Sequence, residues 1–545
     1  MSRQAVLSAE VAPLEERRKR IEQMVLPANI GALLDAAAGD TPDHQALNFF
    51  ESGETATYAE LRDRVGRLAN GLARRGVRHG SHVGVMLPNV IALPISWLAL
   101  GRIGAVMLPM NVAYTGREVT YLTENGNVDW LIVHEDCLPM LAEPGILPAR
   151  ITPDRIFVVG NRKAGYQSWD ELSENEAAHF TAEVPVDIDD LVNLQYTSGT
   201  TGFPKGCMLT HRYWLNLSLV NAHRDGRVFK RILAATPFFY MDPQWLMLMA
   251  FHHRGTLFVA RRQSATRFMS WVRDYRIQFT LFPELAFKQP PHPEDHNNEI
   301  VRVNVYGLHK ENHAALEERF DFVAREAYGM TEIGSGLFMP IEATDMVGSG
   351  SCGRPSPFKE ARIVDEYDHP VKQGEIGELQ FRGPGILQGY YNNPQATQAA
   401  LKDGWFRTGD LFRQDERGYF YIVGRVKDMI RRAGENIAAR EVEAVLRGMP
   451  EIVEAAAVPV PDDTRGEEVK VYVVLKPGLQ PEDLPPQRII AHCEAHLARF
   501  KVPRYVAYIE RIPKTPSEKI AKQVLIQNVK DLRVGSFDRS TGKWL

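Results

Sequence analysis

Cysteine is scarce in this chain, and the few cysteines present are far apart. The 545 residues include 4 cysteines, at positions 137, 207, 352 and 493. They show neither a Cys-x-x-Cys pair nor the Cys/His spacing of a zinc site. We therefore expect no disulfide framework and no zinc site, and the composition fits a reducing compartment, the cytoplasm.

The chain also lacks a secretory signal and a convincing membrane span. Its N-terminal segment, 10–20, is charged where a signal peptide would be apolar. The run 83–101 contains no charged residue and is long enough to be considered as a transmembrane helix. Pro88, Asn89 and Pro94 divide it into a short strand and a helix, so we expect a buried α/β layer and no membrane span.

Neither sign of charge predominates. The 64 basic and 68 acidic residues give a formal net charge of -4. This balance offers no electrostatic reason to expect nucleic acid or an anionic membrane as a partner. Apolar residues make up 44% of the chain, as in ordinary globular proteins. A chain of this length exceeds what one hydrophobic core supports, so at least two domains are expected.

Short apolar runs alternate with helical patterns through most of the sequence. Thr57 and Glu60 form a predicted capping box, and apolar residues at helical spacing extend from it to Gly76. Such alternation favours parallel strands covered by helices. The predicted strands are 83–87, 105–108, 130–133, 156–159, 191–196, 232–235, 256–260, 279–282 and 302–306.

The composition changes near residue 427. Beyond it the sequence predicts helices at 440–447 and 488–498 and alternating strands at 455–460 and 469–475. We therefore predict an α/β fold with a large multilayer N-terminal domain, 1–426, and a small α+β C-terminal domain, 427–545.

Residues 196–211 carry the strongest functional signal, with the sequence Tyr-Thr-Ser-Gly-Thr-Thr-Gly-Phe-Pro-Lys-Gly-Cys-Met-Leu-Thr-His. Its hydroxyls and glycines allow several donors to face one anion, and Lys205 adds a positive charge. A strand is predicted before it and a helix, 214–220, after it. It differs from a Walker A loop, because its glycines are too close and its lysine follows a proline. The residues predicted to hold phosphate are Thr197, Ser198, Gly199, Thr200, Thr201 and Lys205.

A second polar segment follows the apolar stretch that ends at residue 327. It reads Tyr328, Gly329, Met330, Thr331 and Glu332. The tyrosine can stack on adenine, the threonine can donate to a phosphate, and the glutamate is an oxygen ligand of the kind that Mg²⁺ prefers. The same residues also fit a plain polar turn after a strand.

A third candidate is the carboxylate of Asp410. Its two oxygens can accept both hydroxyls of a ribose. Gly-Asp is also a common turn pair, so this residue alone indicates little.

Together these segments resemble the adenylate-forming superfamily, which includes acyl-CoA synthetases, non-ribosomal peptide adenylation domains and luciferases. Matching segments occur in the family's order from about residue 50 to about residue 525. The resemblance implies that 197–205 hold the β- and γ-phosphates of ATP, and that Thr331 and Glu332 reach the α-phosphate and Mg²⁺. The other implied nucleotide contacts are Gly307, Leu308, Tyr328, Gly329 and Met330 at adenine, with Asp410 and Arg425 at ribose.

The resemblance also implies a mobile C-terminal domain with a catalytic lysine. Residues 513–520 resemble the motif that carries this lysine, which makes it Lys519, acting with Lys205, Thr331 and Glu332. Glu518 stands where the family usually has glycine. Lys427 falls at the interdomain hinge. The residues implied to meet coenzyme A are Arg432, Gly434 and Lys501.

Aromatic residues and one carboxylate occur where the family has its acyl pocket. They are Tyr240, Asp242, Trp245, Tyr306 and Phe338. The string around the aspartate resembles that of betaine- and carnitine-type CoA ligases, in which a carboxylate could hold a cationic substrate. We favour a structural role, as the N-cap of a helix that Pro243 begins. Small aromatic or arylacetic acids are equally compatible with the aromatic side chains.

The function implied is that of an ATP-dependent carboxylic acid:CoA ligase that uses Mg²⁺. The acid attacks the α-phosphate, pyrophosphate leaves, and coenzyme A then displaces AMP from the acyl-adenylate. Two alternatives stay open: an adenylation domain that loads a carrier protein, and a nucleotide-binding homologue without catalysis, suggested by Glu518. Because no carrier domain follows residue 545, we expect free coenzyme A as the acceptor. Whether the protein forms a homodimer is left open.

Overall fold

The computed structural model describes residues 11–197, 204–432, 435–514, 520–527 and 529–545. The chain divides into two compact units. The first contains residues up to 197, 205–361 and 381–406, and the second contains 362–380 and 407–545. In the described ranges, no helix combines the length and the apolar character that crossing a membrane would require.

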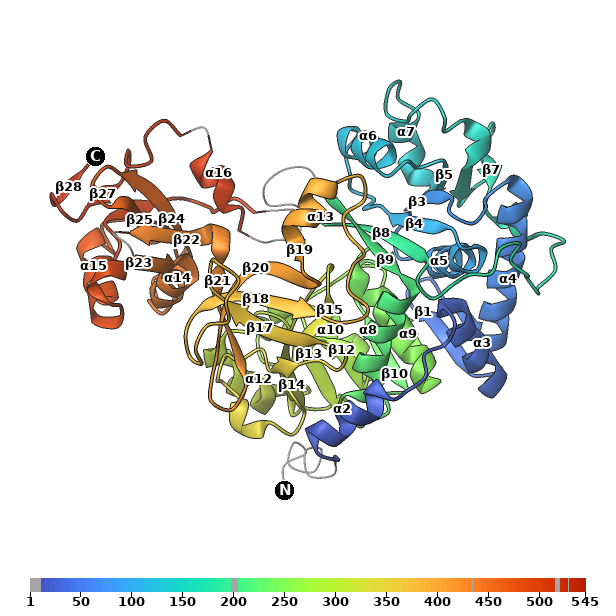
Figure 1. Ribbon diagram of the computed structural model, residues 1–545, viewed down its shortest axis with the longest axis horizontal. Helices are drawn as coiled ribbons and strands as arrows, with labels where there is room; N and C mark the ends of the chain where they lie inside the picture. Colours follow the sequence, from blue (N-terminus) through green and yellow to red (C-terminus); the bar gives the residue numbers. More distant parts are fainter. Residues whose placement is uncertain (1–10, 198–203, 433–434, 515–519, 528) are drawn as a thin grey trace. The chain divides into compact units, whose positions relative to one another are not determined.

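Seven described strands of the first unit form one sheet (Figure 1). Its order is β7 (Gln167–Ser168), β6 (Ile156–Val159), β5 (Trp130–His134), β3 (His82–Met86), β4 (Val106–Pro109), β8 (Leu191–Thr197) and β9 (Lys205–Thr210). Strands β3 to β6 pair in parallel, with Val83 opposite both Met107 and Trp130. The parallel pairing predicted from the apolar runs is therefore confirmed, while β9 pairs antiparallel with β8.

A second sheet of the first unit contains nine described strands. Its order is β16 (Arg354–Pro355), β15 (Gly334–Phe338), β14 (Val323–Met330), β13 (Arg302–Val305), β12 (Phe279–Leu281), β10 (Arg231–Ala234), β11 (Thr256–Val259), β1 (Gln45–Phe49) and β2 (Glu54–Thr57). The pairs from β1 to β14 are parallel, and the outer pairs at both ends are antiparallel. The carboxyl ends of β13 and β14 therefore meet at one edge, where α/β sheets commonly bind ligands.

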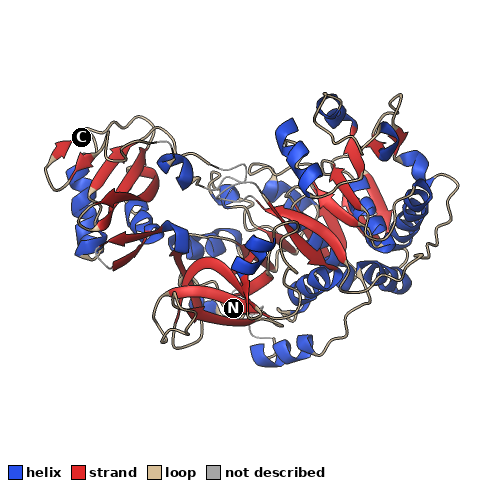
Figure 2. Ribbon diagram, turned by 45° about the horizontal axis from the view of Figure 1, so that its top comes forward, coloured by secondary structure: helices blue, strands red, loops and turns tan. Residues whose placement is uncertain are grey.

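Helices lie on both sides of these strands, as Figure 2 shows. Helix α4 (Tyr58–Arg75) begins at the predicted capping box of Thr57 and Glu60, and it ends at Gly76 in the left-handed conformation. The uncharged run 83–101 forms β3 and most of α5 (Ala92–Ile103), as predicted. The other helices are α2 (Leu14–Glu22), α3 (Ile30–Asp40), α6 (Gly116–Asn125), α7 (Leu138–Leu141), α8 (His211–His223), α9 (Met241–His253), α10 (Phe268–Asp274), α11 (Glu284–Phe287), α12 (Lys310–Phe320) and α13 (Pro394–Ala400).

The second unit has a sheet and a hydrophobic core of its own. Among its described residues the sheet order is β23 (Glu435–Ala438), β22 (Met429–Arg432), β25 (Gly466–Leu475), β26 (Tyr505–Tyr508), β27 (Phe537–Asp538) and β28 (Lys543–Trp544), with β24 (Ile452–Asp462) on β25. Its helices are α14 (Ala439–Arg447), α15 (Pro486–His496) and α16 (Lys522–Ile526). Val442, Leu446, Val471 and Ile489 are fully buried in its core. This architecture confirms the predicted small α+β part.

A five-stranded sheet completes the described chain. Its order is β17 (Glu360–Val364), β18 (Gly377–Arg382), β20 (Trp405–Gln414) and β19 (Leu401–Lys402), with β21 (Phe420–Arg425) on β20. Strands β20 and β21 are antiparallel.

Candidate active site

Part of the predicted site falls outside the described residues. These positions are Ser198, Gly199, Thr200 and Thr201 of the phosphate loop, Gly434, and Lys519 with its neighbour Glu518. The other predicted site residues are described, each within its own unit.

The described ends of the predicted phosphate loop are the two strands of an antiparallel hairpin. Thr197 on β8 lies opposite Lys205 on β9. The helix predicted after the loop is present as α8, but a strand that we did not predict precedes it. The Lys205-Gly206 start of that strand gave no β signal in the sequence. The glycine is required because a Cβ there would lie 2.9 Å from the ring of Tyr196. The lysine is thus held on a strand.

Lys205 and Glu332 both contact one tyrosine, Tyr390. The tyrosine hydroxyl donates a hydrogen bond to Glu332 Oε1 over 2.9 Å. The ammonium nitrogen of Lys205 lies 4.3 Å from the centre of the tyrosine ring. The first unit therefore brings together Lys205, Glu332 and Tyr390. The sequence analysis did not single out the tyrosine.

The predicted adenine residues lie where β13 and β14 end. Gly307 and Leu308 follow β13, and their backbone N–H groups donate to the carboxylate of Glu326 over 2.6 and 3.2 Å. Because β13 and β14 are parallel neighbours, this loop lies at the sheet edge to which β14 brings Tyr328. Gly329 has no room for a side chain, since a Cβ would lie 2.5 Å from the Gly334 carbonyl oxygen.

Tyr328 and its neighbours up to Glu332, which are predicted to contact the nucleotide, differ in how far they are buried. The tyrosine is buried and its ring stacks near Phe381, with centroids 6.3 Å apart. Met330 and Thr331 are half-buried, and Glu332 is 6% exposed. The segment therefore presents a backbone edge, a hydroxyl and a carboxylate close together.

Asp410 and Arg425, predicted at the ribose, pair directly in the second unit. They face each other across β20 and β21, and Arg425 Nε lies 3.1 Å from Asp410 Oδ1. The aspartate is buried. Lys427, the predicted hinge residue, lies in a 3-10 turn, Val426–Asp428, directly after β21.

The basic residues predicted to meet coenzyme A already have partners in the second unit. Arg432 forms a two-point ion pair with buried Glu468, over 2.6 and 3.2 Å. Lys501 Nζ donates to both carboxylate oxygens of Glu441, over 2.7 and 2.8 Å. These ion pairs give both cations a structural role in addition to any contact with a ligand.

Asp242 does not cap its helix as predicted. Helix α9 begins at Met241 after an N-cap at Tyr240, so the aspartate lies inside the first turn. Its Oδ1 accepts a hydrogen bond from the indole N–H of Trp245 over 3.1 Å. Burial raises the pKa of the Asp242 carboxyl above its ordinary value, and the indole hydrogen bond opposes that rise in pKa.

Tyr306 lies close to Asp242 although the two are far apart in the sequence. The residue is 51% exposed. Burial of its hydroxyl, with the nearby Asp242 charge, raises the pKa of Tyr306 to about 12. The neighbouring strand residue Asn304 accepts a hydrogen bond from Arg224 over 2.8 Å. Burial and the nearby Arg302 lower the pKa of Arg224 to about 9.

The remaining predicted acyl residues differ in exposure. Tyr240 is 38% exposed, and its hydroxyl accepts a hydrogen bond from Asn111 over 3.5 Å. Trp245 and Phe338 are buried, and the Arg224 guanidinium lies 5.3 Å from the centre of the Phe338 ring. Only the tyrosines of this set thus offer large exposed aromatic surfaces.

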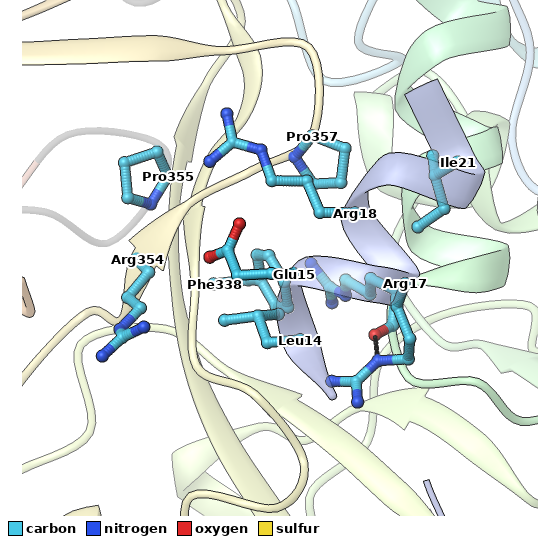
Figure 3. Close-up of a pocket in the computed structure, with 10 residues that line it drawn as sticks. Leu14, Glu15, Arg17, Arg18, Ile21, Phe338, Arg354, Pro355 and Pro357 are labelled. Atoms are coloured by element: carbon cyan, nitrogen blue, oxygen red, sulfur yellow. Dashed lines mark hydrogen bonds between the residues drawn. The ribbon is translucent and has the colours of Figure 1, made fainter. Parts of the chain in front are cut away.

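Phe338 borders a cavity of about 60 Å³ beside α2 (Figure 3). Two of its charged lining residues form ion pairs: Arg17 binds Glu342 over 2.8 Å and Arg18 binds Glu22 over 3.0 Å. Of the residues predicted to hold phosphate, the two that the structure describes, Thr197 and Lys205, are not among those that line it. The lining residues are Leu14, Glu15, Arg17, Arg18, Ile21, Arg224, Phe338, Arg354, Pro355 and Pro357.

Comparison with known families identifies the class of this enzyme. The model of the AMP-binding enzyme family matches residues 34–391, and the model of the AMP-binding enzyme C-terminal domain matches 441–519. The chain therefore belongs to the AMP-binding enzyme family. It is an AMP-forming ligase of the adenylate-forming superfamily, which confirms the resemblance seen in the sequence.

Individual relatives agree with this assignment. The crotonobetaine/carnitine–CoA ligase of Salmonella choleraesuis is 32% identical over 91% of this chain and 98% of its own length. That of Proteus mirabilis is 31% identical over 89% and 96%. The crystal structure of ATP-bound MatB from Rhodopseudomonas palustris is 26% identical, with a TM-score of 0.83 over 93% of this chain and 100% of its own. The predicted fold, a large α/β part with a smaller C-terminal part, is confirmed.

Proposed function

We propose that this protein is an ATP-dependent carboxylic acid:CoA ligase that forms an acyl-adenylate and then an acyl-CoA thioester. The observation that carries the proposal is the placement of Lys205 and Glu332 around Tyr390. A cation and a carboxylate held together at the mouth of a predicted phosphate loop suit a triphosphate. The ATP-bound relative and the ligase names of the curated relatives support the same reaction.

In the first step, the acid attacks the α-phosphorus of ATP and pyrophosphate leaves. Negative charge grows on the phosphoryl oxygens, and preorganised cations stabilise it. Lys205 supplies one fixed positive charge, and Lys519 is proposed to supply another. The hydroxyl of Thr331 and the hydroxyls of the phosphate loop donate to the remaining oxygens.

The carboxylate of Glu332 fits Mg²⁺, because it is a hard oxygen donor beside a hydroxyl residue. Among the described residues, no group of three or more His, Cys, Asp or Glu could hold a metal ion. The metal would be held by the Glu332 carboxylate together with phosphate oxygens, since Mg²⁺ is commonly bound by one or two carboxylates and the phosphates of its substrate. When bound, it neutralises phosphate charge.

In the second step, the thiol of coenzyme A displaces AMP. We propose that the chain divides at residue 427, so that 427–545 brings Lys519 to the first step and 432–436 to the second. Asp410 and Arg425 are proposed to bind the ribose. Arg432, Gly434 and Lys501 are proposed near coenzyme A.

The proposed substrate is a small acid that carries a cationic group. Asp242 supports this, because it is not the N-cap of α9 and burial raises its pKa, so a bound cation would relieve the cost of its charge. The crotonobetaine/carnitine ligases among the relatives point the same way. The exposed rings of Tyr240 and Tyr306 favour a second candidate, a small aromatic acid.

A pyrophosphate-release screen with a panel of acids tests the proposal. The panel would contain quaternary-ammonium acids, their neutral carbon isosteres and small aromatic acids. Release that depends on the acid, followed by thioester formation with free coenzyme A, is the expected result. Adenylate that only a carrier protein discharges would favour a carrier-loading enzyme, and ATP binding without any acid-dependent release would favour a non-catalytic homologue.

A further inference from the structure

One segment of the first unit, 387–391, is bonded to the backbone of both candidate phosphate-binding regions. Along β9 it exchanges backbone hydrogen bonds of 2.8–3.0 Å with Gly206 and Met208. At its other end, Leu387 N–H donates to the carbonyl oxygen of Glu332 over 2.8 Å. The segment therefore fixes the start of β9 and the turn after β14 to each other.

Tyr390 lies in the middle of this segment, and its side chain repeats the same link. The residue is 5% exposed. Its hydroxyl donates to Glu332 Oε1 over 2.9 Å, and its ring faces the ammonium group of Lys205 at 4.3 Å. Its own N–H donates to Thr397 Oγ1 over 2.9 Å, so α13 fixes its backbone as well.

Each contact is of a kind that orients a charged group. A hydrogen bond to a carboxylate is stronger than one between neutral groups and sets the direction of the acceptor. An ammonium group over an aromatic ring is attracted by the negative face of that ring. A buried tyrosine held at its backbone can therefore keep both charged groups in place before ligand binds.

The geometry points to Tyr390 as a positioning residue for the ATP and Mg²⁺ site: its hydroxyl orients Glu332 for the metal, and its ring orients Lys205 for the phosphates. This inference rests on the proposed function, which assigns the metal and the phosphates to these two side chains. The tyrosine itself touches neither ligand in this scheme.

Binding of ATP to the full-length protein at a series of Mg²⁺ concentrations, measured by calorimetry, tests the inference. Tyr390→Phe removes the bond to Glu332 and keeps the ring at Lys205. We expect the Mg²⁺ concentration that gives half-maximal ATP binding to rise about tenfold, while ATP affinity at saturating Mg²⁺ changes less than twofold. Tyr390→Leu also removes the ring, so ATP affinity should fall several-fold even at saturating Mg²⁺.

The neighbouring residue provides a matched control. The Tyr391 hydroxyl accepts a hydrogen bond from Asn127 and is not part of this link. Tyr391→Phe should therefore bind ATP and Mg²⁺ as the wild type does. A Mg²⁺ dependence of Tyr390→Phe equal to that of Tyr391→Phe would overturn the inference. The near-isosteric phenylalanine variant decides this even if the leucine variant unfolds.

The wild-type protein reports separately on the proposed function. Mg²⁺-dependent ATP binding without acid-dependent pyrophosphate release would contradict the ligase proposal and leave the role of Tyr390 standing. Wild-type ATP binding that does not depend on Mg²⁺ would contradict the role of the tyrosine hydroxyl.

Discussion

At the scale of single residues, the burial of charge separates functional candidates from structural ones. Arg302 and Asp225 are fully buried and form an ion pair with each other, so each offsets the charge of the other and neither is open to a ligand. Asp242 differs, because its described partner is an uncharged indole. A half-buried carboxylate with a neutral partner favours binding of an external cation, because pairing with the cation offsets the free-energy cost of burying the negative charge.

Asp242→Asn should remove selectivity for a cationic acid. We expect kcat/KM for a quaternary-ammonium acid to fall about 10- to 100-fold, because a charged contact is lost, and to change less than threefold for its neutral carbon isostere. Pyrophosphate release measures both. Since burial raises the pKa of this carboxyl, the wild-type preference for the cationic acid should weaken, as pH falls, at a higher pH than an exposed aspartate would allow. Equal losses for both acids would contradict the assignment.

At the scale of secondary-structure elements, the predicted adenine position depends on how the loop after β13 is held. The loop after β13 is held to β14 by Glu326, which accepts from the N–H groups of Gly307 and Leu308. Without this carboxylate, the N–H groups of Gly307 and Leu308 lose these two hydrogen bonds to β14.

Glu326→Ala should therefore weaken nucleotide binding more than it weakens the fold. We expect the Kd for ATP to rise about tenfold, which corresponds to the loss of hydrogen bonds to one charged acceptor. Calorimetric titration with ATP measures this. Glu318→Ala, on the exposed surface of α12, serves as the control. A Kd unchanged from that control would show that the loop does not need this carboxylate.

Helices α8 and α9 bring three histidines into one cluster. The His223 ring lies 5.9 Å from that of His252 and 6.0 Å from that of His253. Burial, with the charges of neighbouring histidines, lowers the pKa of His252 and of His253 to about 3. The cluster is therefore neutral in the folded protein at pH values where an unfolded chain would bind protons.

Acid should destabilise the fold through these histidines. The pKa of His252 and of His253 is about 6.5 when the chain is unfolded and about 3 when it is folded, so the unfolded state gains protons first and stability falls progressively below pH 6.5. His252→Gln should be less stable at pH 7.5 but should lose less stability between pH 7 and pH 5, measured by urea unfolding. His369→Gln, at a side chain 77% exposed, is the control. An unchanged pH slope in His252→Gln would refute the explanation.

At the scale of the whole molecule, the layers could be predicted from the sequence more readily than the contacts of the site. Apolar runs fix parallel strands, because buried strands need apolar residues on both faces. Tyr390 was missed because its partner Glu332 is 58 residues away, and such pairing leaves no local pattern. The prediction of Asp242 as an N-cap was wrong. Proline is tolerated in the first helical turn, so the position of Pro243 did not reveal that α9 begins at Met241.

The proposed assignment of Lys519 to adenylation predicts that the two half-reactions can be separated by substitution. Substitution of Lys519 by alanine should lower acid-dependent ATP–pyrophosphate exchange at least 100-fold, because the cation proposed to offset the developing phosphoryl charge is lost. Thioester formation from preformed acyl-adenylate should stay within a few-fold of wild type, since that step displaces AMP and does not need this cation. Lys514→Ala is the matched control, because this nearby lysine already pairs with Glu454 over 2.7 Å. Equal losses in both steps would mean that Lys519 supports the fold of the second unit and does not serve adenylation alone.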